Sequence, residues 1–169
     1  GDFLKLNLNT FENNISIIGN FPYNISSQIL FKAFDNRDQV TEVIGMFQKE
    51  VAERIVSVKG KKKGILSVLL QAFYDIEYCF TVNEHLFDPA PKVKSGVIKM
   101  KRNNRKKLGC DEKTFIKIVK AGYNQRRKTL RNALKLFTLN SNDEIEILLQ
   151  KRAEQLNVEE FIFLTKNVQ

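Results

Sequence analysis

The sequence has very few of the residues that build metal centres and disulfide frameworks. Its single histidine is His85, and its two cysteines, Cys79 and Cys110, lie far apart and form no Cys-x-x-Cys pair. A structural zinc site needs several such ligands at short spacings, so the composition excludes a Cys/His metal centre. Two isolated thiols are typical of a reducing compartment, so we expect free cysteines in a cytoplasmic protein.

The sequence also lacks a long hydrophobic run, although 43% of its 169 residues are hydrophobic. A membrane-spanning helix needs about 20 consecutive apolar residues, so we expect no membrane-spanning segment and no membrane partner. The chain does not open with the basic and then apolar segments of a signal peptide. Its apolar content is instead enough for the core of one ordinary domain with a small addition.

Negative charge is scarce relative to positive charge. The chain has 28 lysines and arginines against 19 aspartates and glutamates, which gives a net charge of +9. Such an excess favours a polyanionic partner, and nucleic acid is the usual one. The basic residues gather around 59–63, 99–107 and 126–131, where they are either phosphate contacts or ordinary solvated surface. The candidate RNA contacts are Lys61, Lys62, Lys63, Lys92, Arg102, Arg126, Arg127, Lys128 and Arg131.

The first part of the chain alternates between strand and helix patterns. Short β-branched or aromatic runs predict strands, apolar residues at helical spacing predict helices, and 65–72 fits either. The strands are expected at 15–19, 40–48, 73–82 and 94–102, and the helices at about 26–34 and 49–58. Glu50, Glu53 and Arg54 look catalytic at a glance, but their spacing fits an ion pair within one helix better.

After a polar, basic stretch at 103–109 the apolar pattern is helical to the end, and Ser141 or Asn142 is a suitable helix cap. Strands alternating with helices, followed by helices only, predict an α/β domain and a small all-α domain. We place them at residues 1–104 and 105–169. The first part has too few strand–helix units for a complete doubly wound sheet, so we expect it to be the C-terminal portion of a larger domain.

One stretch combines unusual chemistry with a stiff backbone. An apolar strand runs into Asn20-Phe21-Pro22-Tyr23, and a helix starts soon after it. The Asn20 amide both accepts and donates hydrogen bonds, Pro22 restricts the turn, and Tyr23 offers a flat face for stacking. These groups suit a site that holds a planar base and steers its exocyclic amine. A strand end with a proline turn and a core tyrosine is the alternative that these four residues alone leave open.

Further segments make a family resemblance specific. They are Gly1-Asp2-Phe3-Leu4, Asn20 to Ser26, the Gln48-Lys49-Glu50-Val51-Ala52-Glu53-Arg54-Ile55 run, Phe87 to Ser95 with its Phe-x-Pro-x-Pro-Lys-Val-x-Ser pattern, and Gln125 to Leu134. In this order and at these spacings the chain resembles the rRNA adenine N6-dimethyltransferase family over nearly its whole length. The long segments favour the bacterial members that modify two adjacent adenines near the 3′ end of small-subunit rRNA.

The resemblance implies a Rossmann-like methyltransferase domain that uses S-adenosylmethionine, followed by a small helical domain. It implies that Asp2 binds the adenine amino group of the cofactor. It also implies that Asn20 contacts the cofactor and accepts a hydrogen bond from the target N6 amine. The Phe21-Pro22 backbone would assist, and Tyr23 and Phe87 would stack on the target adenine. The implied partner is small-subunit rRNA in a precursor of the 30S subunit, bound by a monomeric enzyme of ribosome biogenesis.

Three other readings stay open. A large-subunit rRNA adenine methylase of the macrolide-resistance type shares the Asn-x-Pro-Tyr and Phe-x-Pro-x-Pro-Lys-Val motifs. A non-catalytic RNA-binding or ribosome-assembly factor could also use a methyltransferase scaffold, although Asn20 and Tyr23 are intact. A DNA adenine methylase fits less well, because those enzymes usually carry Asp/Asn-Pro-Pro-Tyr/Phe.

One departure from the family pattern concerns the cofactor. The chain carries no Gly-x-Gly-x-Gly loop, which in this family precedes the Asp2 motif and cradles the methionine part of the cofactor, nor the acidic residue that binds its ribose. We therefore expect a fragment that lacks the N-terminal cofactor-binding part.

This chain alone should bind S-adenosylmethionine weakly or not at all, and it should be inactive by itself. Isothermal titration of the 169-residue chain with S-adenosylmethionine checks this expectation. Binding with a dissociation constant in the micromolar range would contradict it.

Overall fold

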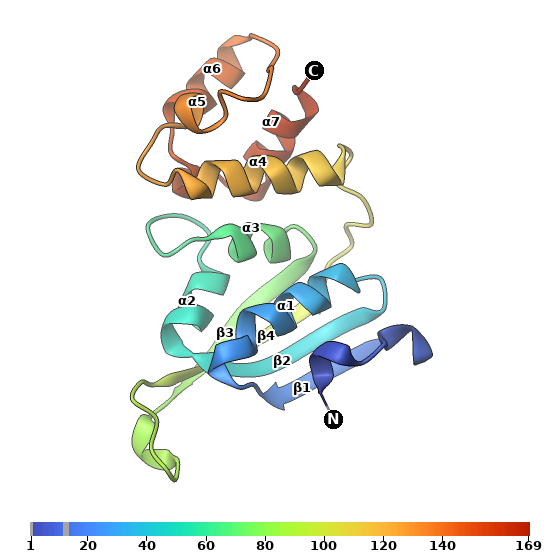
Figure 1. Ribbon diagram of the computed structural model, residues 1–169, viewed down its shortest axis with the longest axis vertical. Coiled ribbons are helices and arrows are strands. Elements are labelled where there is room, and N and C mark those ends of the chain that lie inside the picture. Colours follow the sequence, from blue (N-terminus) through green and yellow to red (C-terminus); the bar gives the residue numbers. More distant parts are fainter. Residues whose placement is uncertain (1, 12–13) are drawn as a thin grey trace. The chain divides into compact units, whose positions relative to one another are not determined.

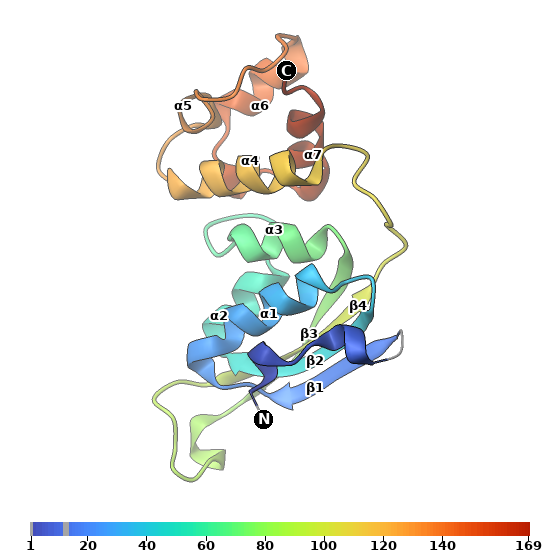
Figure 2. The same ribbon diagram turned by 45° about the vertical axis from the view of Figure 1, so that its right-hand side comes forward.

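The computed structural model describes residues 2–11 and 14–169, which form two compact units (Figures 1 and 2). The first unit comprises Gly1–Val56 and Phe73–Asn104, and the second comprises Ser57–Ala72 and Arg105–Gln169. The last crossing from the first unit to the second follows residue 104, within the polar stretch at 103–109. The division differs from the predicted ranges in one segment, because 57–72 belongs to the helical unit.

The first unit is built on a four-stranded sheet in the order β1-β2-β4-β3. Its parallel pair is β1 (Ile15–Asn20) and β2 (Val40–Gln48), and β2 pairs antiparallel with β4 (Ser95–Arg102), which pairs antiparallel with β3 (Tyr74–Val82). The four predicted strands are confirmed to within a residue at each end. Figure 1 shows β1 beside the N-terminal segment, and the long β3–β4 connection projects away from the sheet.

One helix, α1 (Ser26–Asp35), connects β1 to β2. A second helix, α2 (Lys49–Val56), follows β2 directly and ends two residues earlier than predicted. No side-chain hydrogen bond caps the start of α1, and the hydroxyl of Ser26, its first residue, donates to the Tyr23 carbonyl at 2.8 Å. The ion pair within α2 is confirmed, since Arg54 lies 2.7 Å from the Glu50 carboxylate.

The chain leaves β1 through a tightly packed aromatic contact. Phe21 is buried, and its ring centroid lies 5.2 Å from that of Phe47. Gly19 and Gly45 are register partners on β1 and β2, and a methyl group on Gly45 would lie only 2.3 Å from Cε2 of Phe21. The ring therefore occupies the space that side chains at these two positions would need.

The second unit is helical, as predicted for its larger part. Its helices are α3 (Ile65–Gln71), α4 (Glu112–Asn124), α5 (Leu130–Ala133), α6 (Asp143–Gln150) and α7 (Val158–Lys166). Asn142 accepts a hydrogen bond from the Ile145 amide at 2.9 Å, which confirms it as a helix cap. The core is apolar and includes Leu69, Phe115, Ile118, Leu130, Leu156, Phe161 and Leu164.

Short 3₁₀ turns occupy several connections. They are η1 (Phe3–Lys5), η2 (Leu8–Thr10), η3 (Tyr23–Ile25), η4 (Glu84–Leu86) and η5 (Ala153–Gln155). In the part of the chain that the structure describes, no helix has both the length and the apolar character that a membrane crossing requires. Cys79 and Cys110 are both free thiols, as predicted.

Replacing Gly45 with alanine should destabilise the chain by about 1–3 kcal/mol, because the new methyl group would overlap the Phe21 and Phe47 rings. Urea unfolding of both proteins measures this loss. Ser16→Ala on the exposed side of β1 is the control and should change stability by about 0.5 kcal/mol or less. Equal stability of Gly45→Ala and the unsubstituted chain would show that the Phe21 ring is free to move.

Candidate active site

The register of the sheet brings two of the motif segments to one edge. Asn20, the last residue of β1, pairs with Met46, and the Phe21 amide donates to the Met46 carbonyl at 3.3 Å. Two residues further along β2, Gln48 pairs with Ser95 at the start of β4. The carboxyl ends of the parallel strands therefore lie beside the first residue of β4, and such ends are where α/β sheets bind their ligands.

A hydrogen bond joins the two motifs at this edge. The Tyr23 hydroxyl lies 2.6 Å from Oγ of Ser95, which is fully buried. Tyr23 belongs to the turn after β1, and Ser95 ends the Phe-x-Pro-x-Pro-Lys-Val-x-Ser segment. Because the bond fixes the far end of the tyrosine side chain, it limits how far the ring can turn.

The predicted acceptor residues lie together. A groove of about 340 Å³ is lined by Asn20, Phe21, Pro22, Tyr23, Phe87, Pro89 and Pro91. The Asn20 side chain is exposed, whereas Tyr23 and Phe87 are half-buried. The groove thus combines one amide with two aromatic rings from distant parts of the sequence, which suits a flat, polar-edged ring such as a nucleobase.

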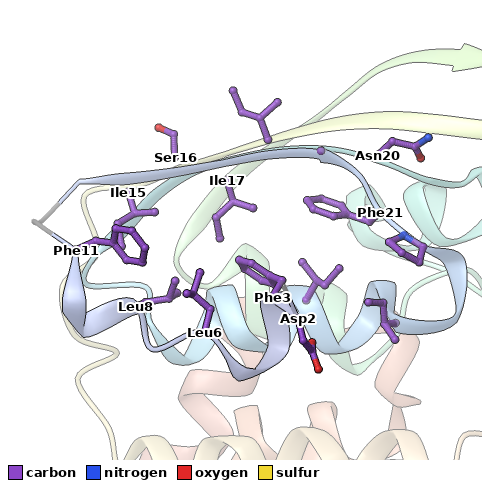
Figure 3. Close-up of a pocket in the computed structure, with 15 residues that line it drawn as sticks. Asp2, Phe3, Leu6, Leu8, Phe11, Ile15, Ser16, Ile17, Asn20 and Phe21 are labelled. Atoms are coloured by element: carbon purple, nitrogen blue, oxygen red, sulfur yellow. The ribbon is translucent and has the colours of Figure 1, made fainter.

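A second, larger pocket lies on the other side of the same turn. It has a volume of about 750 Å³ and is formed mainly by the N-terminal segment and β1 (Figure 3). Phe3 and Leu8 point toward Ile17 of β1, whereas the Asp2 carboxylate and the Asn20 amide point away from this apolar centre. Asp2 and Asn20, the two predicted cofactor-binding residues, therefore line one pocket. Gly1 of the first motif lies outside the described residues.

The lining of this pocket fits only part of the expected cofactor. Asp2 accepts a hydrogen bond from the Leu4 amide at 3.0 Å and lies 3.8 Å from the Lys5 ammonium. A carboxylate beside apolar walls suits an adenine ring and its amino group. The charged methionine end needs cationic or helix-terminal partners, and among the described lining residues there is no lysine, arginine or histidine. Over residues 2–11 and 14–169 no cluster of metal-ligating side chains occurs.

One predicted RNA contact, Arg102, is engaged within the first unit. Its guanidinium donates to the Phe73 carbonyl at 2.7 Å and the Arg37 carbonyl at 2.9 Å, and it lies over the Phe73 and Tyr74 rings. Arg102 is half-buried. The role of Arg102 as a phosphate contact stays a prediction, although its Nε and Nη1 atoms already donate to backbone carbonyls.

Lys63 departs from its predicted role. It is fully buried, and its ammonium donates to the Leu156 carbonyl at 2.6 Å. Burial lowers the pKa of Lys63 to about 8, and the nearby Glu160 carboxylate offsets part of that effect. A buried ammonium cannot reach a phosphate, so the prediction of Lys63 as an RNA contact is wrong, and its contacts are those of an internal anchor.

The remaining predicted cations lie on the surface. Arg131 is exposed and forms an ion pair with Glu146, and Arg126 lies 3.1 Å from the Glu154 carboxylate. The others are Lys61, Lys62, Lys92, Arg127 and Lys128, all of them exposed. Lys92 belongs to the first unit, and the rest belong to the second.

Comparison with known proteins places this geometry in a family. The model of the ribosomal RNA adenine dimethylase family matches residues 1–169. The chain belongs to the ribosomal RNA adenine dimethylase family. The predicted resemblance is therefore confirmed.

Curated relatives carry a more specific name. The chain is 62% identical over 167 residues to the ribosomal RNA small subunit methyltransferase A of Cytophaga hutchinsonii, covering 98% of this chain and 65% of that protein. It is 60% identical over 171 residues to the protein of the same name from Flavobacterium johnsoniae, covering 99% of this chain and 66% of the relative. The chain thus spans slightly under two thirds of the length of these relatives.

Solved structures support the fold. A dimethyladenosine transferase from Plasmodium falciparum superposes with a TM-score of 0.80 at 23% identity, covering 97% of this chain and 69% of that one. The 23S rRNA methyltransferase ErmE gives a TM-score of 0.73 at 17% identity, covering 99% and 69%. The predicted α/β, Rossmann-like class of this rRNA dimethylase family member is confirmed.

Sequence reasoning assigned no role to Ser95 or Gly45, which the structure places in contact with the motif residues. The available signal for Ser95 was its position at the end of a long, specific motif. Gly45 gave no signal of its own, because a single glycine in a strand pattern indicates only a bulge or a close approach.

A double-mutant cycle tests the bond between the motifs. Tyr23→Phe and Ser95→Ala should each cost about 1 kcal/mol of unfolding free energy, and together less than their sum, with a coupling of about 0.5–1.5 kcal/mol. Urea unfolding of the four proteins measures it. The exposed Tyr78–Thr81 pair, whose oxygens lie 2.7 Å apart, is the matched control and should show a smaller coupling. Strict additivity at Tyr23 and Ser95 would mean that the bond does not hold the ring.

Proposed function

We propose that this chain is part of a protein as long as its relatives. That protein methylates the N6 amines of two adjacent adenines near the 3′ end of small-subunit rRNA. The methyl donor is S-adenosylmethionine. The observation that carries the proposal is the groove in which Asn20 lies with Tyr23 and Phe87 at the carboxyl end of β1. The names of the relatives support the small subunit as the substrate.

Asn20 is the group that selects and orients the amine. Its exposed amide oxygen accepts a hydrogen bond from the N6 amine of adenine, and the backbone of Phe21 and Pro22 assists. This bond would keep the nitrogen lone pair directed at the incoming methyl group, and the proton that the amine loses would pass to water. Because the described groove contains no histidine, cysteine, lysine or carboxylate, the residues supply position and polarity rather than a strong base.

Tyr23 and Phe87 hold the plane of the base. Stacking of a base on an aromatic side chain contributes about 1–3 kcal/mol, which offsets part of the cost of taking the adenine out of its stack in RNA. The Ser95 hydroxyl keeps the Tyr23 ring in place, so part of the ordering cost is met before the base arrives.

The cofactor pocket meets the groove at Asn20, Phe21 and Pro22, which line both. Asp2 would hold the adenine amino group of S-adenosylmethionine, and the apolar side chains that line the pocket, such as Phe3 and Ile17, would lie against its ring. Bound there, the cofactor supplies a methyl group that its sulfonium makes strongly electrophilic. The chain's own contribution is to keep the acceptor nitrogen next to the pocket, across the three residues that line both.

The partner is a precursor of the 30S subunit, bound in the cytoplasm by a monomer. The net charge of +9 favours the approach of this polyanion. Lys61, Lys62, Lys92, Arg127, Lys128 and Arg131 are the exposed cations that we assign to the RNA backbone.

A chimera tests the proposed activity at full length. This chain replaces the matching 65% of the Cytophaga hutchinsonii relative, and the chimera is assayed with radiolabelled S-adenosylmethionine on unmethylated 30S subunits. The chimera should methylate adenine N6. Asn20→Ala should lower the rate by about 100-fold or more, as removal of one positioned hydrogen-bonding group typically does. Asn104→Ala, at an exposed position, is the control and should retain full activity.

The outcomes separate the competing functions. Activity on 50S precursors or 23S rRNA but not on 30S subunits would support a large-subunit methylase. Tight 30S binding without methylation, in an Asn20→Ala protein that keeps its cellular function, would support an assembly factor. Full activity of Asn20→Ala would remove Asn20 from the mechanism.

A further inference from the structure

One side chain makes the polar contacts between the N-terminal segment and the rest of the first unit. Over the described residues 2–11, the backbone hydrogen bonds stay within the segment and form the turns η1 and η2. The contacts to the rest of the described chain come from Lys32 on α1, whose ammonium donates to the Leu4 carbonyl at 2.8 Å and to the Leu6 carbonyl. Figures 1 and 2 show the segment beside α1.

The two carbonyls that Lys32 serves have no other donor. Within η1 the Leu6 amide donates to the Phe3 carbonyl at 3.2 Å, whereas the carbonyls of Leu4 and Leu6 accept from no backbone amide of the described chain. Leu4 is half-buried, and an unpaired carbonyl there would cost free energy. Lys32 is half-buried too, and its ammonium lies 5.5 Å from the centre of the Phe3 ring.

Leu4 links this lysine to the carboxylate of Asp2. Its amide donates to the Asp2 carboxylate at 3.0 Å, and its carbonyl accepts from Lys32 at 2.8 Å. Asp2 therefore caps the start of η1, and Lys32 serves the carbonyls at its end, where cations are favoured. Because one residue makes both bonds, the direction of the Asp2 carboxylate depends on a cation that α1 holds in place.

Lys5 is the other cation near Asp2, but it holds the carboxylate poorly. Its ammonium lies 3.8 Å from Asp2, and its side chain is 87% exposed. Such an exposed pair is screened by salt, and the long lysine side chain keeps most of its rotamer freedom. The restraint on the Asp2 carboxylate therefore comes from η1 and Lys32 rather than from Lys5.

A fixed carboxylate matters because the pocket offers little else that is polar around an adenine ring. Asp2 lines the pocket of about 750 Å³ together with apolar side chains such as Phe3 and Leu8. Apolar walls hold a flat ring without selecting its edge, whereas a carboxylate selects a ring that carries an amino group. A carboxylate that is ordered before the ligand arrives avoids the entropy cost of ordering it on binding.

We propose that Lys32 is a positioning residue for the adenine end of S-adenosylmethionine. By holding Leu4 and Leu6 it keeps the Asp2 carboxylate where the adenine amino group binds. Lys32 is not among the residues that line the pocket, so it acts through η1. Its effect falls on the affinity and base selectivity of cofactor binding and not on methyl transfer itself. The identity of the ligand rests on the proposed function.

The test uses the full-length chimera and two probes, S-adenosylhomocysteine and S-inosylhomocysteine, in which a carbonyl replaces the adenine amino group. Isothermal titration without RNA should show that the chimera prefers the adenosyl probe and that Asp2→Ala abolishes the preference. Lys32→Met should weaken the adenosyl probe by about tenfold and the inosyl probe by less than about twofold, because only the former needs an ordered carboxylate. Lys32→Arg keeps donors for both carbonyls and should restore the preference.

Kinetics and a matched variant separate positioning from a general loss of structure. Lys32→Met should raise the KM for S-adenosylmethionine by about tenfold and leave kcat and the KM for 30S subunits within about twofold. Lys5→Met removes the exposed neighbour of Asp2 and should change every value by less than about twofold. Asp2→Ala/Lys32→Met should bind no more weakly than Asp2→Ala, because both changes remove the same interaction.

Urea unfolding checks that Lys32→Met is folded. Should it fail to fold, Lys32→Gln, which keeps one neutral donor group, carries the same test with a smaller expected loss. Equal losses for the two probes, equal losses in Lys5→Met and Lys32→Met, or additive losses with Asp2→Ala would each overturn the proposal.

Methylation by the chimera reports separately on the proposed function. A chimera that methylates 30S subunits while Lys32→Met keeps the preference for the adenosyl probe would refute the role of Lys32 alone. A chimera that shows the Lys32-dependent preference but methylates no adenine would refute the proposed function alone.

Discussion

The packing of the Phe21 ring over Gly19 and Gly45 fixes the point at which the chain leaves the sheet, and the candidate site depends on that point. Both glycines lie in register on parallel strands, so the ring rests on bare backbone and against Phe47. A ring held in this way leaves Asn20 on one side and Pro22 and Tyr23 on the other with little freedom. The amide that would meet the substrate is therefore exposed on a rigid support, which is the arrangement that precise positioning needs.

From this support the site extends to distant parts of the sequence through a few specific contacts. The hydrogen bond between Tyr23 and Ser95 joins the turn after β1 to the first residue of β4. The loop before β4 then contributes Phe87 to the same groove. Asn20, Phe21 and Pro22 border both the groove and the apolar pocket with Asp2, so the proposed places for an acceptor and for a donor are adjacent. A transfer reaction requires this adjacency more than it requires reactive side chains.

In the helical unit, a buried lysine and an arginine donate to backbone carbonyls. An apolar core of leucine, isoleucine and phenylalanine holds α3 to α7 together, and a single buried ammonium is inserted at its edge. Lys63 and Arg126 look like two more cations of a basic protein, yet their donors serve the backbone carbonyls of Leu156 and Lys63 itself. Charge counting treats all cations alike, whereas the hydrogen bonds of the folded chain show which of them serve the backbone. Arg102 is the corresponding support in the first unit.

The sequence by itself determined the four strands, most of the helices, the family and the Asn20–Tyr23 motif, but it left residues 65–72 open between helix and strand. Those features depend on local periodicity, on proline and on residues close together in the chain, as with Asn20 to Tyr23 and the Arg54–Glu50 pair. Only the tertiary structure decided that 57–72 joins the helical unit, that Ser95 holds Tyr23, and that Gly45 makes room for Phe21. It also decided that Lys63 and Arg102 face inward. Each of these depends on contacts between residues far apart in the sequence. Neither periodicity nor composition shows which lysine of a loop is exposed to water and which donates to a backbone carbonyl.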